Sequence, residues 1–251
     1  MELYDMHSHI LPAFDDGAKT VEDSLALIDV LRKQGVRNIA LTPHFYTNEM
    51  SYDDYLVKRK EAFDNFAPHM PDDINFILGC EVYITDYLFN NNDLSQITYG
   101  NSRYILTEFA YQSRFTDKTM QSFYLLVQNY GLTPVMPHVE RYPYLIDNPG
   151  AIGVLKDLGT VIQTNVSSYT QEASFFRKRK LFKLIDKGLI DIVGTDAHSL
   201  HHNNPEVYTE ALKAISKKCG DRAVYRMMDN AAGIFRAAQK QPTNPANNQK
   251  A

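Results

Sequence analysis

The sequence predicts an α/β fold in which about seven parallel strands alternate with helices and close into a single TIM-like barrel. Short apolar segments such as NIAL, FIL, YIL and DIV, typical of strands covered on both faces, alternate with helical patterns. Potential metal ligands follow nearly every one of these segments, and the ends of all strands converge on one mouth only in a barrel. The length of 251 residues suits one barrel domain, which needs roughly 250 residues.

The predicted elements alternate along the chain. In the first helix Val21, Leu25 and Leu31 share one face, Thr20 is placed to cap the N-terminus, and Gly35 ends the helix. Other helices also end at glycines. The predicted strands cover residues 2–6, 37–43, 74–79, 102–106, 133–136, 160–165 and 189–193. The predicted helices cover residues 21–34, 52–66, 116–130, 149–158, 171–187, 205–218 and 221–238, with an irregular segment at 86–101.

Composition and charge narrow the class of protein. Hydrophobic residues make up 44% of the chain, enough for a large core, and the net charge of −4 argues against a nucleic-acid-binding surface. Cys80 and Cys219 are too few for a disulfide framework, which favours a reducing compartment. Without an apolar leader or spanning segment, we expect a soluble cytoplasmic protein that does not insert into membranes. Residues 1–239 should form one domain and 240–251 a flexible polar tail.

Five histidines and four carboxylates lie at or just past the ends of the predicted strands. His7 and His9 are two residues apart, so both point to one face of the first strand and can bind one ion. A single such residue is ordinarily a surface residue, but only three of the eight histidines fall outside this set. The candidate ligands are His7, His9, Asp16, His44, Glu81, Glu108, His138, Asp196 and His198.

The chemistry of this set indicates a cluster of ions. Imidazole and carboxylate ligands without thiolate suit manganese, iron or zinc, and nine ligands exceed the needs of one ion. Glu81, among the middle strands, is the expected bridge between ions. Four carboxylates and one bridging hydroxide sum to about −5, so three divalent ions leave a positive site that attracts a phosphate dianion. Arg141, three residues after His138, would add a further positive charge.

Together the motifs resemble those of PHP-domain metal-dependent phosphoesterases. The chain contains HSHILP followed by DDG, then TPH, GCE, HVER and GTDAH. Over roughly residues 3–235 this combination is similar to the bacterial protein-tyrosine phosphatases that regulate capsule and exopolysaccharide synthesis. The resemblance implies a distorted (β/α)7 barrel of the PHP fold and two to three divalent ions, preferably manganese, with iron, zinc or magnesium as alternatives. It also implies that the substrate is the phosphotyrosine tail of a bacterial tyrosine kinase.

Carried over by position, the resemblance assigns the ligands to three ions and gives three residues a part in catalysis. The three sets would be His7, His9, Glu81 and Asp196; Glu81, Glu108 and His138; and Asp16, His44 and His198. Arg141 would bind the phosphate, and it is expected to act in catalysis together with Asp16 and Glu81.

Two departures from the family pattern concern the substrate side of the site. The family commonly has glycine where this chain has Ala13, before the acidic pair. Related enzymes carry a second phosphate-binding arginine after the DAH motif, where this chain has His201 and His202 in a loop without arginine. Protonated His202 could replace that arginine, and Phe14 and Tyr46, which lie beside ligands in the sequence, could contact the aromatic ring of the substrate.

The expected reaction is hydrolysis of phosphotyrosine by a metal-bridged hydroxide, with a phenolate leaving group whose parent pKa is about 10. The absence of a Cys-x5-Arg motif excludes a cysteine-dependent tyrosine phosphatase. One alternative is a small-molecule phosphatase such as a histidinol-phosphate phosphatase, and another is a phosphopeptide-binding regulator without activity. The cognate kinase is left open, and so is oligomerisation. The RKRK run at 177–180 is either a solvated helix face or a patch for an anionic surface.

Overall fold

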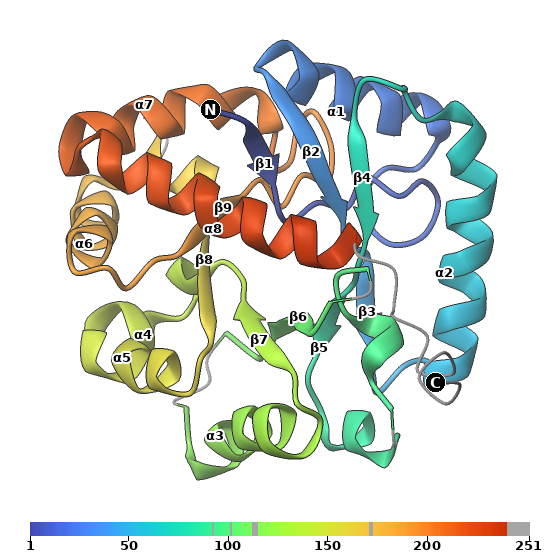
Figure 1. Cartoon of the computed structure of the whole chain (residues 1–251), viewed down its shortest axis with the longest axis horizontal. Coiled ribbons are helices and arrows are strands. Elements are labelled where there is room, and N and C mark those ends of the chain that lie inside the picture. Colours follow the sequence, from blue (N-terminus) through green and yellow to red (C-terminus); the bar gives the residue numbers. More distant parts are fainter. Residues whose placement is uncertain (92, 101, 112–114, 171–172, 240–251) are drawn as a thin grey trace, which may run out of the picture.

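The parallel strands lie side by side in chain order, with helices outside them (Figure 1). They occupy seven positions in the wall, which we call lines, because two of the lines consist of two short strands each. The structure is a computed structural model that describes residues 1–91, 93–100, 102–111, 115–170 and 173–239; the predicted tail at 240–251 lies outside this part of the chain. The strands are β1 (Leu3–Asp5), β2 (Val36–Leu41), β3 (His44–Tyr46), β4 (Asn75–Leu78), β5 (Glu81–Tyr83), β6 (Tyr104–Glu108), β7 (Thr133–Met136), β8 (Val161–Asn165) and β9 (Ile192–Gly194).

Two of the lines are interrupted, which divides the strands into the sheets β1-β2-β4 and β3-β5-β6-β7-β8-β9. The sequence predicts one strand at 37–43, but Pro43, which has no backbone N–H, separates β2 from β3. Gly79 and Cys80 separate β4 from β5. Backbone bonds from Gly79 N to Leu41 O (2.8 Å) and from Glu81 N to Pro43 O (3.0 Å) keep the two interrupted lines paired. The wall is therefore continuous across the breaks.

The first and last lines are joined just beyond their strands. Ser8 and Ala197 form an isolated parallel bridge. His9 N donates to Ala197 O at 2.9 Å, and Asp196 N donates to His7 O at 2.7 Å. The predicted α/β fold with parallel strands is confirmed, and these bonds bring the two ends of the barrel wall together at the predicted ligands.

The helices agree with the predicted pattern in most places. They are α1 (Val21–Lys33), α2 (Tyr52–Phe66), α3 (Asp117–Tyr124), α4 (Pro143–Asp147), α5 (Pro149–Asp157), α6 (Phe175–Asp186), α7 (Tyr208–Cys219) and α8 (Asp221–Gln239). Thr20 caps α1 in a capping box with Asp23. The α-helical part predicted at 116–130 is shorter, because residues 125–129 form a π-helical turn, and α4 was not predicted. The first residues of the helix predicted at 171–187 lie outside the described chain.

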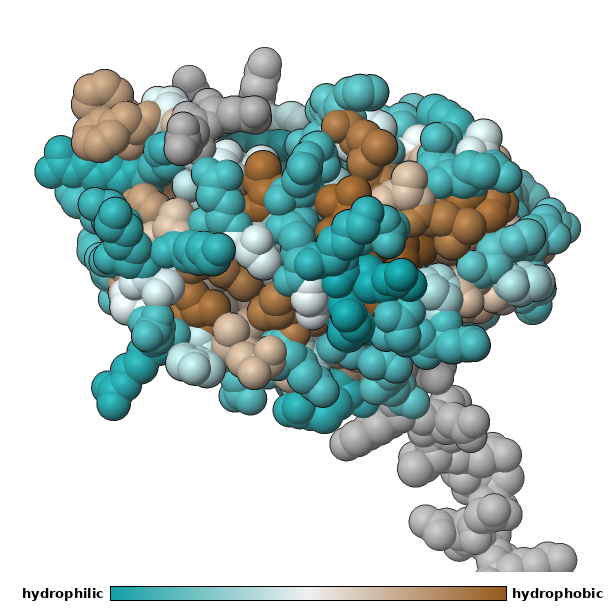
Figure 2. Space-filling model, turned by 90° about the horizontal axis from the view of Figure 1, so that it is seen from above, coloured by the Kyte–Doolittle hydropathy of each residue, from teal (hydrophilic) through white to brown (hydrophobic). Residues whose placement is uncertain are grey.

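Apolar residues fill the interior of the fold away from the strand ends. The helix α8 runs across β1, β4 and β9 and packs against them (Figure 1). The rings of Phe235 in α8 and Tyr4 in β1 meet edge to face, with their centroids 5.6 Å apart. Mostly hydrophilic side chains cover the face drawn in Figure 2, with smaller hydrophobic groups between them. No helix in the described part of the chain has the length and apolar character needed to cross a membrane.

Candidate metal centre

The segment after β1 delivers the first two candidate ligands to the inside of the wall. His7 and His9 are both fully buried, and their Nε2 atoms lie 3.1 Å apart. The following loop folds back closely on His9, because a Cβ atom at Gly17 would lie only 2.0 Å from His9 O. This contact explains why glycine follows the two aspartates: no larger residue allows the loop to return to the strand.

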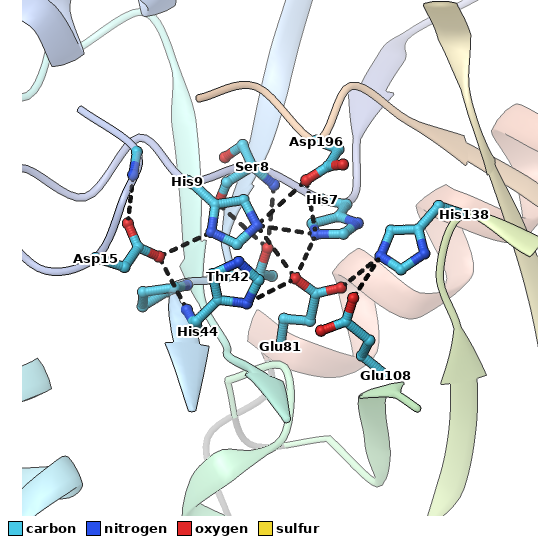
Figure 3. Close-up of polar contacts among 12 residues, drawn as sticks. His7, Ser8, His9, Asp15, Thr42, His44, Glu81, Glu108, His138 and Asp196 are labelled. Carbon is cyan, nitrogen blue, oxygen red and sulfur yellow. Dashed lines mark hydrogen bonds and ion pairs between the residues drawn. The ribbon is translucent and has the colours of Figure 1, made fainter. Parts of the chain in front are cut away.

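His7, His9, Glu81 and Asp196 form what we call the inner group, and all four are buried (Figure 3). Glu81 Oε2 lies 3.2 Å from the Nε2 atoms of both His7 and His9. Asp196 Oδ1 lies 3.5 Å from His7 Nε2 and 3.3 Å from His9 Nε2. Atoms bound to one ion at about 2.1 Å lie roughly 3.0–3.4 Å apart, so the spacing of these four atoms fits coordination of a single ion.

Two buried oxygen atoms of the inner group lack hydrogen-bond partners among the described residues, which suits the binding of a cation. Glu81 Oε2 and Asp196 Oδ1 are completely buried and have no hydrogen-bond partner in the described chain. Burying a carboxylate oxygen without a hydrogen-bond partner costs free energy, and buried charges in proteins are usually paired or coordinate a metal ion. The outer nitrogens of the two histidines are oriented from behind, since His9 Nδ1 bonds Asp15 Oδ2 at 2.8 Å and His7 Nδ1 faces Gln163 Oε1 at 3.4 Å. Each Nε2 atom is thereby directed at the centre, as in metal sites.

The protonation of the inner group reflects the same charges. Burial would raise the pKa of Glu81, but the neighbouring imidazoles, His7 foremost, hold it well below its usual value. Burial likewise opposes ionisation of Asp196, whose pKa is held low by His7, His9 and Arg141. Burial would lower the pKa of His9, yet Asp15 and the two carboxylates raise it well above its usual value. Both carboxylates of the inner group are therefore ionised, and their negative charge favours a proton or a cation beside them.

A second set, which we call the entrance group, consists of Asp16, His44 and His198. Asp16 Oδ1 lies 3.4 Å from His198 Nε2 and 3.6 Å from His44 Nε2, and the Asp16 side chain is 68% exposed. His44 and Glu81 are register partners of β3 and β5, which places His44 Nδ1 3.1 Å from Glu81 Oε2. Burial and the charge of His9 lower the pKa of His44 to about 4 and also lower that of His198. Both imidazoles are therefore neutral and able to bind an ion near neutral pH.

The remaining two candidate ligands lie on the other side of Glu81. His138 Nε2 lies 2.7 Å from Glu81 Oε1 and 3.6 Å from Glu108 Oε1. Potential ligand atoms of Glu108 also group with those of Glu81 and His44. Burial, followed by the charge of Glu81, raises the pKa of Glu108 to about 7. All nine residues singled out in the sequence therefore meet in one cluster, with Glu81 in contact with each side of it.

Arg141 points into the cluster from the turn after β7. Its Nη2 atom donates to Asp196 Oδ2 at 2.5 Å, and its Nη1 atom donates to Tyr111 Oη at 3.2 Å. Tyr111 in turn donates to Glu108. The Arg141 side chain is 30% exposed, so it can still meet a ligand from solvent while its position is held by these two partners.

The three other predicted substrate contacts lie around the entrance group. Phe14 and Tyr46 line a cavity of about 290 Å³ beside Asp16 and His44. Tyr46 stacks on His44 with ring centroids 4.9 Å apart, whereas Phe14 is only 8% exposed. His202 is exposed, and its ring meets that of His198 edge to face at 5.3 Å.

Several residues that orient the ligands were not singled out in the sequence. Asp196 Oδ2 accepts bonds from Asn165 Nδ2 and Asn203 Nδ2, each at 2.9 Å, which turns its other oxygen toward His7. Gln163 Oε1 accepts a bond from His138 N at 2.8 Å. The polar residues of VIQTN in an otherwise apolar strand were the signal for Gln163 and Asn165; nothing in the sequence marks Asn203.

Strained backbone is concentrated near this cluster. His138, Asp196 and Asn203 have positive φ angles of 32°, 55° and 49°, a region that residues other than glycine rarely occupy. Such strain persists where the surrounding structure fixes it, commonly at functional sites. Ala13 also has a positive φ, of 54°, a conformation that glycine adopts more readily than alanine.

The parallel α/β fold and a buried histidine–carboxylate cluster at its strand ends define a metal-dependent hydrolase-type site. The sequence pattern of the family described as "Capsular polysaccharide synthesis, CpsB/CapC" matches residues 3–236. The chain is similar to tyrosine-protein phosphatase CpsB of Streptococcus agalactiae, with 32% identity over 93% of this chain and 98% of that protein. It is 31% identical to tyrosine-protein phosphatase YwqE of Bacillus subtilis over 99% and 98% of the two chains. The chain belongs to the CpsB/CapC family.

A solved structure supports the same assignment. It comes from the crystal structures of YwqE from Bacillus subtilis and CpsB from Streptococcus pneumoniae, described as unique metal-dependent tyrosine phosphatases. It superposes with a TM-score of 0.82 and 28% identity, covering 94% of this chain and 95% of that one. The resemblance read from the sequence motifs is thus confirmed at the level of the family.

Proposed function

We propose that this chain is a metal-dependent protein-tyrosine phosphatase that hydrolyses phosphotyrosine on proteins. The observation that carries the proposal is the inner group, in which unpaired buried oxygens of Glu81 and Asp196 face the Nε2 atoms of His7 and His9 beside the guanidinium of Arg141. Relatives of matching length are named tyrosine-protein phosphatases. A cation-binding cluster next to a fixed arginine suits a phosphate ester.

The protein's own residues would supply binding and orientation. When bound, divalent ions lower the pKa of coordinated water and neutralise charge on phosphate oxygens. Arg141 presents a planar fork of donors that fits two phosphate oxygens, and Tyr111 holds that fork in place before the substrate arrives. The cavity lined by Phe14 and Tyr46 lies beside Asp16 and His44, where it could accept the aromatic ring of a phosphotyrosine bound at the cluster.

The chemistry of the leaving group agrees with a tyrosine ester. A phenolate with a parent pKa of about 10 leaves more readily than an alkoxide, so the site has less need of a strong general acid. Asp16 and Glu81 would act by holding the ions, Glu81 as a buried member of the inner group and Asp16 as the exposed carboxylate of the entrance group. His202, beside His198, is our candidate for a second phosphate contact.

The family description supports a cellular context for this activity. We extend the proposal to two or three ions, preferably manganese, and to the phosphotyrosine tail of a bacterial tyrosine kinase in capsule or exopolysaccharide synthesis as substrate. A cytoplasmic location would give access to such a tail. The family description names capsular polysaccharide synthesis, which supports this context.

Phosphate release tests the proposal. Metal-depleted protein is reloaded with manganese and given a phosphotyrosine peptide or histidinol phosphate at equal concentration. We expect preference for the peptide, and a loss of at least about 100-fold in His138→Ala, because removal of a ligand exceeds the usual effect of removing an orienting residue. His69→Ala, which alters an exposed histidine outside the cluster, is the matched control and should retain activity.

Two outcomes would contradict the proposal. Preference for histidinol phosphate would keep the metal centre but assign it to a small-molecule phosphatase. Metal bound at full occupancy without turnover of either compound would favour a regulator that binds phosphopeptides.

A further inference from the structure

A groove of about 600 Å³ between α6 and α7 carries a positive charge that contrasts with the rest of the chain. Its lining contains the cations Lys178, Arg179, Lys183, Lys217 and Lys218, together with the carboxylates of Asp186 and Glu210. The lining therefore has a formal charge of +3 on a chain whose net charge is −4. Within the described residues, none of these five cations is among the lysines and arginines that form ion pairs.

Helix stability explains only part of this charge. Lys217 and Lys218 lie in the last turn of α7, where the helix dipole favours cations. Lys178 and Arg179, however, lie in the N-terminal half of α6, whose first turn contains no acidic residue and whose N-terminus has no side-chain cap. The effect of the dipole is confined to the first turn, so it disfavours Lys178 at the end of that turn and leaves Arg179 almost unaffected. The dipole of α6 therefore accounts for neither cation.

Aromatic residues accompany the cations at the same end of α6. Phe175 and Phe176 are 69% and 74% exposed, although each could bury a large apolar area. Phe175 lines the groove, and the rings of Tyr169 and Phe182, 5.6 Å apart, lie deeper in it. Exposed aromatic side chains next to cations are typical of protein-binding surfaces.

The groove is connected to the metal centre by one short segment. β8 ends at Asn165, which donates to the candidate ligand Asp196 at 2.9 Å. The 3-10 helix η6 (Val166–Tyr169) follows directly and reaches the groove at Tyr169. Lys178 Nζ bonds Thr170 O at 2.8 Å, which fixes this segment to α6. Four residues of 3-10 helix span about 8 Å, so the groove lies within a few residues of an extended peptide of the metal centre.

We propose that the groove binds an acidic segment of the same phosphoprotein whose phosphotyrosine occupies the metal centre. The inference rests on the proposed function and adds a sequence preference to it. The negative charge of aspartate, glutamate or a second phosphate complements the lining, and apolar side chains of the segment meet Phe175. A hollow groove favours an extended chain over a flat anionic membrane surface.

Steady-state kinetics on two phosphotyrosine peptides tests this preference. The peptides share a core around the phosphotyrosine, and their flanks carry either acidic residues or serine and glutamine. We expect a KM about tenfold lower for the acidic peptide, at the lower end of electrostatic steering, and the preference should fall in high salt. The variant Arg179→Glu/Lys183→Glu should abolish the preference, and so should Lys217→Gln/Lys218→Gln, without altering hydrolysis of para-nitrophenyl phosphate.

The matched control is Lys33→Glu/Lys60→Glu, which changes two lysines that are each 74% exposed on α1 and α2, away from α6 (Figure 1). It should keep the preference. Equal KM values for both peptides in the wild type, or an unchanged preference in the α6 variant, would overturn the groove proposal while leaving the phosphatase proposal intact. Failure to hydrolyse any phosphotyrosine peptide would instead contradict the proposed function. Binding to phosphatidylglycerol vesicles through α6, without a peptide preference, would make the groove a membrane surface and overturn our assignment.

Discussion

The inner and entrance groups contain similar ligands in contrasting surroundings. Glu81 and Asp196 of the inner group are at most 1% exposed, whereas Asp16 of the entrance group is 68% exposed. His9 in the inner group has a raised pKa, but burial and the charge of His9 lower the pKa of His44 to about 4. The inner group is thus a closed set of charged side chains that favours a cation, whereas the entrance group consists of neutral imidazoles and one solvated carboxylate.

The two groups also differ in how firmly their side chains are held. The side chains of the inner group are held from behind by Asp15, Gln163, Asn165 and Asn203. Asp16 has no comparable support among the described contacts, and its nearest ligand nitrogen is 3.4 Å away. We expect tight binding of ions at the inner group and exchangeable binding at the entrance, where the substrate enters.

Removing the shared carboxylate should have the largest effect. Glu81→Gln keeps the volume but removes the charge that faces four imidazoles, so kcat/KM should fall by roughly 1,000-fold or more and the inner ion should be lost. Asp16→Asn, the matched change at the entrance, should cost only about 10- to 100-fold and be partly rescued by excess manganese. Metal analysis after dialysis, with kinetics, measures both. Equal losses in the two variants would remove the distinction between the groups.

The next largest effect is expected for the residues that hold the inner group from behind. Gln163→Ala removes the partner of His7 Nδ1 and of the His138 backbone, so manganese affinity should weaken about 10- to 100-fold. Asn203→Ala, which removes one of three donors to Asp196, should have a smaller effect. Calorimetric titration with manganese measures the affinity. An unchanged affinity in Gln163→Ala would show that the inner group does not depend on support from behind.

The pH dependence of metal binding should also differ between residues with raised and with lowered pKa values. Metal-free protein keeps protons on His9, whose pKa is raised, and on Glu108, whose pKa is about 7 rather than its usual 4.5, so a cation must displace them. Affinity should therefore rise between about pH 6 and about pH 8, with proton release detected by calorimetry in buffers of different ionisation enthalpy. His44 and His198, with lowered pKa values, should release none. Binding without proton release would contradict these protonation states.

The contribution of Glu108 to the stability of the metal-free protein also depends on pH. Because its pKa is raised in the folded protein, its contribution to stability is fully present below about pH 4.5 and is lost as the pH rises through about 7. Manganese should offset that loss. Thermal unfolding of the metal-free and metal-loaded proteins across this range should diverge most at the alkaline end.

Ala13→Gly should have the smallest effect, confined to the loop that leads to the entrance group. The left-handed conformation of Ala13 (φ 54°) costs about 1–2 kcal/mol, and the greater freedom of glycine in the unfolded chain returns about 0.5–1 kcal/mol of that. The free energy of unfolding should increase by roughly 0.5–1 kcal/mol, measured by denaturant titration, with metal affinity of the inner group unchanged. Loss of stability would show that the loop is not strained at this residue.

The sequence predicted which candidate ligands meet in one cluster more completely than it predicted the structure around them. Ligand positions follow from local rules: a two-residue spacing places His7 and His9 on one face, and parallel strand ends converge. The residues behind the ligands depend on long-range packing, because Asn203 reaches Asp196 only after its loop has folded back. The strand breaks at Pro43 and Gly79 were also missed, since apolar runs mark a strand without marking where its pairing is interrupted.

The most direct measurement is an anomalous difference map from crystals grown with manganese, recorded on both sides of the manganese absorption edge. The contrast between the two groups predicts a strong peak among His7, His9, Glu81 and Asp196, and a weaker peak beside Asp16, His44 and His198 that fades after brief chelation. A map with no peak in the inner group, or with the stronger and more persistent peak at the entrance, would contradict it.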